Sequence, residues 1–103
     1  MTPQQLQDVL KSGKYLYLLD VREPSELEQA RMRGVELHHI PLGELLDRYT
    51  EIPADAEVIA ICRSGARSAQ ACQYLMSKGY KATNLEGGML AWAAEIDPEL
   101  EIN

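Results

Sequence analysis

One of the two cysteines stands where an apolar run meets a short polar loop, and its surroundings are those of a reactive thiol. The run Glu57–Ile61 leads into Cys62, which opens the segment Cys-Arg-Ser-Gly-Ala-Arg-Ser over residues 62–68. A helical pattern follows directly. Unpaired N–H groups at the start of a helix attract anions, and such surroundings lower the pKa of a thiol. Because the thiolate is the nucleophilic form, we predict that Cys62 is a catalytic nucleophile.

The composition of this loop argues against a buried cysteine without chemical function, which is the commoner use of free cysteine. The polar residues that follow Cys62 cannot all be buried beside it, so we expect its sulfur to be exposed to solvent. Gly65 permits a positive φ, which lets successive N–H groups turn inward as an anion-binding nest. We therefore predict that the residues after Cys62 bind the substrate, namely Arg63, Ser64, Gly65, Ala66, Arg67 and Ser68.

The second cysteine, Cys72, has a different setting and serves as an internal comparison. Its helical spacing with other apolar residues predicts that it faces the core as inert packing, together with Ala69, Ala71, Leu75 and Met76. A disulfide between Cys62 and Cys72 would pull the loop against its own helix, so we do not expect one.

The elements that must position Cys62 alternate between helices and strands. Spacing and turn residues predict helices at about residues 3–12, 41–49 (with Leu42, Leu45 and Leu46 inward), 67–78 and 89–94. Residues 24–26 indicate a loop that leads into a short helical turn ending at about Ala30. Apolar runs predict strands at about 15–21, 35–40, 57–61 and 82–85. This order is typical of an α/β domain with a mostly parallel sheet flanked by helices. Sites in such sheets form beyond the carboxyl ends of strands, so we expect Asp20–Arg22 and Cys62 to meet in one crevice.

Size and charge narrow the class of protein. The 103 residues suit one domain, residues 1–103. A net charge of −6 argues against nucleic acid as a partner. No apolar run is long enough for a membrane span, and the first residues lack the pattern of a signal peptide, so we expect a cytoplasmic protein. A strand would point the adjacent His38 and His39 in opposite directions, and we expect no metal site.

Three stretches, in this order and spacing, carry a resemblance to a known family. They read Leu-Asp-Val-Arg-Glu-Pro-Ser-Glu-Leu at 19–27, Val-Ile-Ala-Ile-Cys-Arg-Ser-Gly-Ala-Arg-Ser at 58–68 and Leu-Glu-Gly-Gly-Met-Leu-Ala-Trp at 85–92. On these stretches the chain resembles the rhodanese (sulfurtransferase) superfamily, specifically its single-domain members. The resemblance covers essentially the whole chain, and it implies a five-stranded parallel sheet flanked by helices.

The resemblance also implies a reaction. Cys62 would accept a sulfane sulfur and become a persulfide cradled by the N–H groups of the loop, while Arg63 and Arg67 would help to bind an anionic donor such as thiosulfate. The sulfur would then pass to a thiophilic acceptor, either cyanide or a thiol, in a two-step covalent scheme without a cofactor. Rhodanese-like domains also serve as sulfur relays or regulatory parts of larger proteins. A module that works with a protein partner is therefore the alternative.

The length of the loop separates sulfur transfer from a related chemistry. Phosphatases and arsenate reductases that resemble this superfamily carry a longer cradle of the form Cys-x5-Arg. Here four residues lie between Cys62 and Arg67, and Ser68 stands where the longer cradle has its arginine. The shorter ring suits one sulfur atom better than a tetrahedral phosphate, which favours sulfur transfer.

Further residues have supporting roles by the same resemblance. Asp20 and Arg22 match a family Asp-x-Arg pair that braces the active-site region, although a surface ion pair is the alternative. Gly87–Gly88 is expected to allow a close turn beside the loop, and Trp92 is expected in the core or the pocket wall. The chain departs from the family at Ala30–Gly34, where a Gly-His-Ile segment is common; this leaves open the local packing and the role of its two arginines.

Overall fold

Four parallel strands and five α-helices alternate in the computed structural model, which describes residues 1–103. The strands are β1 (Tyr17–Asp20), β2 (Leu37–His39), β3 (Glu57–Ile61) and β4 (Lys81–Asn84). The helices are α1 (Pro3–Lys11), α2 (Pro24–Gln29), α3 (Leu45–Arg48), α4 (Ala66–Ser77) and α5 (Gly88–Glu95), and 3₁₀ turns at Leu42–Glu44 and Tyr49–Glu51 flank α3. The sheet order is β2-β1-β3-β4. None of these helices combines the length and the apolar character that a bilayer crossing requires.

The sheet has four strands, so the five strands implied by the resemblance are wrong. Met1 alone lies along the outer edge of β4. Its amino group donates to the Asn84 carbonyl at 3.0 Å, and its carbonyl accepts from the Glu86 N–H at 2.9 Å. Thr2 then caps α1, and the chain turns away from the sheet. A single paired residue is too short to count as a strand, which usually has at least about three residues.

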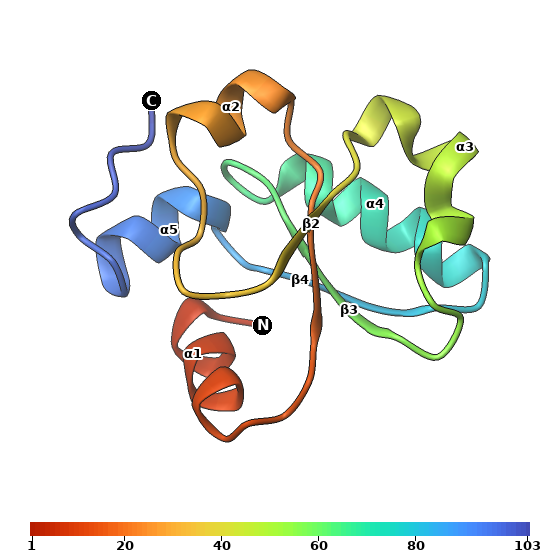
Figure 1. The fold of residues 1–103 in the computed structure, drawn as a ribbon, viewed down its shortest axis with the longest axis horizontal. Coiled ribbons are helices and arrows are strands. Elements are labelled where there is room, and N and C mark those ends of the chain that lie inside the picture. Colours follow the sequence, from red (N-terminus) through yellow and green to blue (C-terminus); the bar gives the residue numbers. More distant parts are fainter.

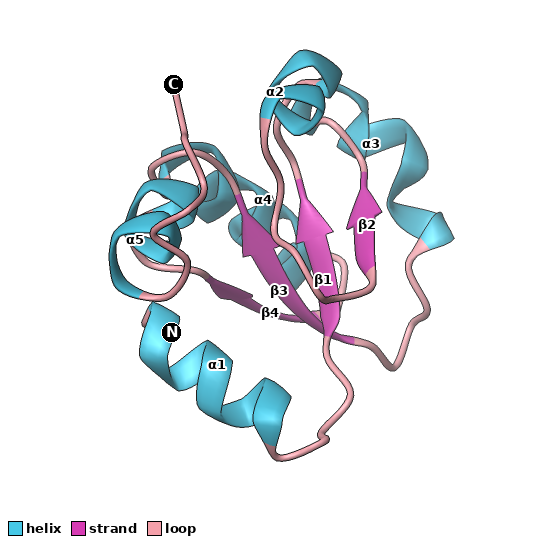
Figure 2. Ribbon diagram, turned by 60° about the vertical axis from the view of Figure 1, so that its left-hand side comes forward, coloured by secondary structure: helices cyan, strands magenta, loops and turns pink.

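The sheet is covered on both faces, and successive strand residues alternate between the two coverings. Leu18 and Ile59 pack with side chains of α1 and α5, including Leu6 and the buried Trp92. Leu19 packs on the opposite face, with side chains of α3 and α4. Figures 1 and 2 show α1 and α5 on one side of the sheet and α3 and α4 on the other. Burial on both faces explains why the two central strands, β1 and β3, are nearly continuous apolar runs.

Two side chains that the spacing assigns to the core lie at the surface instead. Leu46 is 64% exposed and Met76 is 53% exposed, whereas Leu45 and Leu75, directly before them, are fully buried. Each residue of a helix is turned by about 100° from the one before it, so a narrow buried face takes one of two consecutive apolar residues.

The carboxyl ends of β1 and β3 lie side by side, as predicted. Asp20 is the register partner of Ile61, and the Val21 N–H donates to the Ile61 carbonyl at 2.9 Å. Cys62 therefore leaves the sheet next to Asp20–Arg22. The short helix α2 follows β1 at this end of the sheet (Figure 2). The polar segments that the sequence analysis selected thus gather at one edge of the fold.

Candidate active site

The Cys62 sulfur lies within the loop between β3 and α4 and accepts hydrogen bonds from it. The Gly65 N–H donates to Sγ at 3.0 Å, and the Ser68 hydroxyl lies 3.2 Å from the same atom. The N–H groups of Ser64 and Ser68 also stabilise a charge on the sulfur. Gly65 has a φ of +108°, which turns the loop into the first turn of α4. The Gly65 N–H therefore faces inward, as predicted for this loop.

The loop keeps its N–H groups inward because α5 binds its first carbonyls. The Met89 N–H donates to the Cys62 carbonyl at 2.8 Å, and the Leu90 N–H donates to the Arg63 carbonyl at 3.0 Å. Gly88 permits this approach, since a Cβ there would lie 2.5 Å from the Cys62 carbonyl oxygen. The close turn predicted beside the loop is confirmed, and it fixes the peptide groups that surround the sulfur.

Opposing effects set the pKa of the Cys62 thiol. Burial is the largest single effect and raises this pKa, but hydrogen bonds from the Ser68 hydroxyl and from backbone N–H groups of the loop together outweigh it, so the pKa is lowered. Cys72 lies on the core side of α4, where burial raises the pKa of its thiol to about 11. The two cysteines therefore differ in the direction that the sequence indicates, with one thiol poised to ionise and one held neutral.

The Cys62 sulfur is not open to solvent, and the expectation that it would be exposed is wrong. Cys62 is 1% exposed and belongs to the core cluster between the sheet and α3 and α4. The surface has four hollows, and none of them is lined by a residue of 62–68. The physical reason is the ring itself, because donors that approach the sulfur closely enough to bond also cover it. Asp20–Arg22 and Cys62 lie side by side as expected, but none of the four hollows joins them.

Asn84, at the end of β4, bonds to both residues that donate to the Cys62 sulfur, Gly65 and Ser68. Its Nδ2 donates to the Gly65 carbonyl at 3.0 Å, and its Oδ1 faces the Ser68 hydroxyl. The Ser68 hydroxyl has one proton and three acceptors within reach, namely Cys62 Sγ, Asn84 Oδ1 and the Gly65 carbonyl. The sequence analysis missed Asn84. The available signal was its position directly before the Leu-Glu-Gly-Gly stretch.

Both arginines of the loop already hold an acceptor. Arg67 donates from Nη1 and Nη2 to the two carboxylate oxygens of Glu26 at 2.6 and 2.8 Å. The hydrogen bond from Arg67 is the main cause that lowers the pKa of Glu26 to about 2, so this carboxylate is charged at neutral pH. Arg63 donates from Nε to the Asn103 carbonyl at 2.7 Å. Glu26 was missed as a site residue, although it lies in the first stretch that carries the resemblance.

Asp20 and Arg22 form a buried ion pair, not a surface one. Their side chains are 0% and 1% exposed. The Arg22 Nη2 donates to Asp20 Oδ2 at 2.9 Å and to the Ala30 carbonyl at 2.9 Å, and Nε donates to both carboxylate oxygens. The Arg22 backbone N–H also donates to Asp20 Oδ1, at 3.0 Å. The pair ties the end of β1 to the segment that follows α2.

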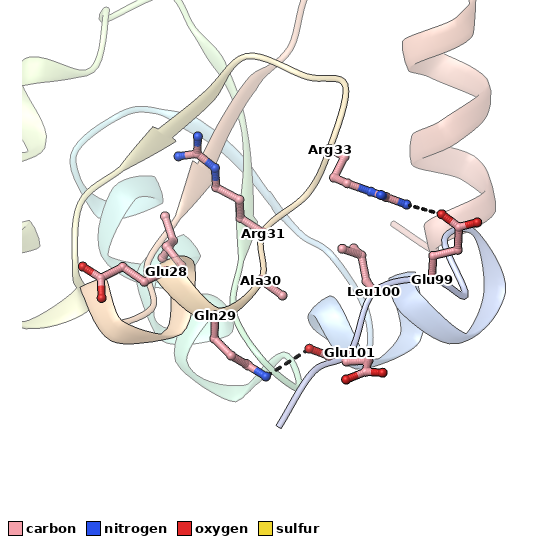
Figure 3. A pocket seen from close by; sticks show the side chains of 9 residues that line it. Glu28, Gln29, Ala30, Arg31, Arg33, Glu99, Leu100 and Glu101 are labelled. Atoms are coloured by element: carbon pink, nitrogen blue, oxygen red, sulfur yellow. Dashed lines mark hydrogen bonds and ion pairs between the residues drawn. The ribbon is translucent and has the colours of Figure 1, made fainter.

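The departure at Ala30–Gly34 packs against the fold and borders a hollow of about 620 Å³. In the segment Ala30–Gly34, Met32 is buried among side chains of α1 and α5. Arg33 is paired with Asp97 and Glu99, whereas Arg31 makes no ion pair and borders the hollow. Figure 3 shows this hollow between the end of α2 and the C-terminal segment. None of the loop residues after Cys62 reaches it, so it is separate from the sulfur.

No group of three or more His, Cys, Asp and Glu side chains gathers in a way that could hold a metal ion. The two adjacent histidines face different neighbours. The His38 ring stacks on Tyr17 with ring centroids 3.9 Å apart, and His39 Nε2 lies 2.7 Å from the Arg22 carbonyl. Each imidazole is thus engaged by a different part of the chain.

Comparison with known proteins gives a consistent result. The family described as Rhodanese-like domain matches residues 2–95. A sulfurtransferase from Allochromatium vinosum is 42% identical over 94 residues, which cover 87% of this chain and 83% of that protein. YrkF of Bacillus subtilis, which has the provisional name of a sulfur carrier protein, is 39% identical over 87 residues, covering 84% of this chain and 46% of its own length.

The fold is similar to that of solved structures. The rhodanese-like domain protein from Staphylococcus aureus matches with a TM-score of 0.84 at 30% sequence identity. The match covers 100% of this chain and 96% of that chain. The similarity thus extends over the entire fold and includes the strand-loop-helix segment that carries Cys62.

Proposed function

The chain belongs to the rhodanese-like domain family, and from this membership we propose that it is a sulfurtransferase that works through a persulfide on Cys62. Relatives that bear the name sulfurtransferase support transfer of sulfur in general. The observation that carries the assignment to Cys62 is the ring of hydrogen-bond donors around its sulfur, made by the Gly65 N–H at 3.0 Å and the Ser68 hydroxyl at 3.2 Å. These donors stabilise the thiolate, which is the form that attacks sulfur.

The proposed reaction has two displacement steps. In the first, the Cys62 thiolate attacks the outer sulfur of an anionic donor such as thiosulfate; the S–S bond of the donor breaks, and sulfite leaves with the electron pair. In the second, a thiophilic acceptor attacks the outer sulfur of the persulfide and returns Cys62 as thiolate. Cyanide would yield thiocyanate, and a thiol would yield a persulfide. Both steps balance without a cofactor.

The residues around the sulfur have proposed roles that follow from their contacts. The N–H groups of residues 63–68 would cradle the outer sulfur of the persulfide, because fixed donors stabilise a developing anion without rearrangement. Arg63 and Arg67 would bind the donor by exchanging their present acceptors for it. Asp20 and Arg22 would hold the neighbouring strand end rigid. Both cysteines are free, and we place the reaction in a reducing compartment such as the cytoplasm.

A sulfur relay is the second candidate, and one observation favours it. Cys62 is 1% exposed, so a free small donor meets a closed site. A protein donor could open that site by binding to the surrounding segments. The relative YrkF, with its name of sulfur carrier protein, supports the same role. In this case the persulfide would form readily from a protein donor and slowly from thiosulfate.

Mass spectrometry after treatment with thiosulfate tests the proposal. We expect a gain of one sulfur atom on Cys62 that a reductant removes and that cyanide releases as thiocyanate. Cys62→Ser should abolish the gain, whereas the matched variant Cys72→Ala should retain most of it. A sulfur gain on Cys72, or transfer by the Cys62→Ser variant, would contradict the assignment. If Cys62 gains sulfur from a protein persulfide but not from thiosulfate, the result would favour the sulfur relay over the free-standing enzyme.

A further inference from the structure

The ion pair between Arg67 and Glu26 bears on which sulfur donor the site accepts. Arg67 is the cation that the proposed function offers to an anionic donor, yet both of its terminal nitrogens bind the Glu26 carboxylate, at 2.6 and 2.8 Å. The two side chains are 35% and 26% exposed, so the pair lies at the boundary between the interior and solvent. The charge that would attract a dianion is therefore offset by a carboxylate that lies against it.

We propose that Glu26 is a specificity residue: it disfavours compact dianionic donors such as thiosulfate and favours a donor whose sulfur is carried on a thiol, as in a low-molecular-weight or protein persulfide. This inference rests on the proposed function, since it concerns the donor of the same sulfur. A dianion has to displace Glu26 from Arg67 or approach beside it. A thiol-borne persulfide carries at most one negative charge and therefore competes less with Glu26 for Arg67.

The other arginines near the site have different acceptors. Arg63 donates to the Asn103 carbonyl at 2.7 Å. Arg22 is buried and satisfied by Asp20 and a backbone carbonyl. The chain as a whole carries a net charge of −6. Arg63 pairs with no carboxylate side chain and keeps its charge, so the balance between Glu26 and Arg67 adjusts how strongly the region beside the sulfur attracts an anion.

The transfer from a thiol-borne persulfide is chemically complete. The Cys62 thiolate attacks the outer sulfur of the donor, a new S–S bond forms to Sγ, and the S–S bond of the donor breaks. The electron pair leaves with the donor's inner sulfur as a thiolate, which takes up a proton from water. No oxidant or reductant is consumed, and the persulfide on Cys62 is the same intermediate as with thiosulfate.

The structure allows a substitution that removes the charge of Glu26 while keeping its local contact. Glu26 Oε1 also accepts the Glu23 N–H at 3.0 Å at the start of α2. Glu26→Gln retains an oxygen for that N–H, and its amide nitrogen cannot accept from Arg67. Glu28→Gln is the matched control, because Glu28 lies on the same helix, is exposed and makes no ion pair. Glu26→Asp keeps the charge on a shorter side chain.

The experiment compares two donors, thiosulfate and 2-hydroxyethyl persulfide, by the rate of persulfide formation on Cys62. We expect Glu26→Gln to raise the second-order rate with thiosulfate by about tenfold, as removal of one nearby like charge predicts for a dianion, and to raise the rate with the persulfide, which carries at most one negative charge, by about threefold or less. Glu28→Gln and Glu26→Asp should keep the wild-type ratio between the two donors.

The outcomes separate this inference from the proposed function. If the ratio between the two donors is unchanged or falls in Glu26→Gln, or if Glu26→Asp shifts it equally, Glu26 does not act through its charge and the inference is overturned. If neither donor places sulfur on Cys62 in the wild type, it is the proposed function that fails. Because the readout is a ratio within one variant, a partial loss of folded protein cancels from it.

Discussion

Replacing Ser68 with alanine is the most direct test of how the Cys62 thiol is activated. The Ser68 hydroxyl is 3.2 Å from the sulfur and is fully buried, so no water takes its place at that distance. Ser68→Ala removes this donor and leaves the backbone N–H groups of the loop in position. Burial, which raises the pKa of Cys62, is retained. The sign is therefore clear: the pKa of Cys62 rises, and less thiolate is present at neutral pH.

The structure also indicates the size of the effect. A hydrogen bond to a charged group stabilises it by about 1.5–3 kcal/mol. The lower end applies here, because the single proton of Ser68 is shared with Asn84 and the Gly65 carbonyl. About 1.4 kcal/mol corresponds to a tenfold change in an equilibrium. At pH values below the pKa of Cys62, we therefore expect Ser68→Ala to have about tenfold less thiolate than the parent and to be alkylated about tenfold more slowly. At high pH the thiol is ionised in both proteins, and their rates should converge.

The assay is the pH dependence of the rate at which iodoacetamide alkylates Cys62, measured by mass spectrometry in a Cys72→Ala background. The matched control is Ser64→Ala. Ser64 contributes through its backbone N–H, and its side chain is exposed, so its profile should coincide with that of the parent. If the Ser68→Ala profile coincides with the parent profile, or if Ser64→Ala shifts as far, the hydroxyl does not activate the thiol and this reasoning is refuted.

Three further predictions concern stability. Asp20→Asn leaves Arg22 buried with one charge uncompensated and should lower the free energy of unfolding in urea by about 3 kcal/mol; a loss below about 1 kcal/mol would show that the pair is unimportant. Gly88→Ala places a Cβ 2.5 Å from a backbone carbonyl oxygen at positive φ and should cost about 2 kcal/mol or more. Gly13→Ala, also at positive φ but in open space, should cost about 1 kcal/mol, and equal losses would contradict the steric argument. Because burial raises the pKa of Cys72 to about 11, its thiol stays protonated when the unfolded chain has already ionised. Stability should therefore fall as pH rises from about 9 to about 11, and this extra fall should be absent in Cys72→Ala.

The order of elements was predictable from the sequence because each element carries its own local signal. Thr2 and Pro3 predict the start of the first helix, and Thr2 indeed forms a reciprocal cap with Gln5. The nearly continuous apolar run at Tyr15–Val21 predicts a strand of a covered parallel sheet, although the observed strand is the shorter Tyr17–Asp20. The predicted helix at 41–49 is present only as one turn of α-helix between two 3₁₀ turns, with Gly43 in the first of them.

The loop itself was also predictable, since Cys62 and the residues that turn around it are contiguous in the chain. The contacts that complete the site come from distant elements and were not predictable. Asn84 reaches Ser68 from β4, and Glu26 reaches Arg67 from α2, 41 positions away along the chain. Spacing within one segment carries no information about which side chains from another segment arrive beside it. The burial of Cys62 was not predicted because the loop donors that bond to its sulfur also cover it.

Burial alone does not separate the two cysteines of this chain. Cys62 is 1% exposed and Cys72 is 5% exposed, and both belong to the same core cluster. Burial raises the pKa of both thiols, yet the pKa of Cys62 is lowered overall while that of Cys72 rises to about 11. The difference lies in the donors. Cys62 has the Gly65 N–H and the Ser68 hydroxyl on its sulfur, and these persist because α5 binds the outward carbonyls of the loop. The lowered pKa of this core thiol therefore depends on donors from its own loop, which backbone contacts from the distant helix α5 keep in place.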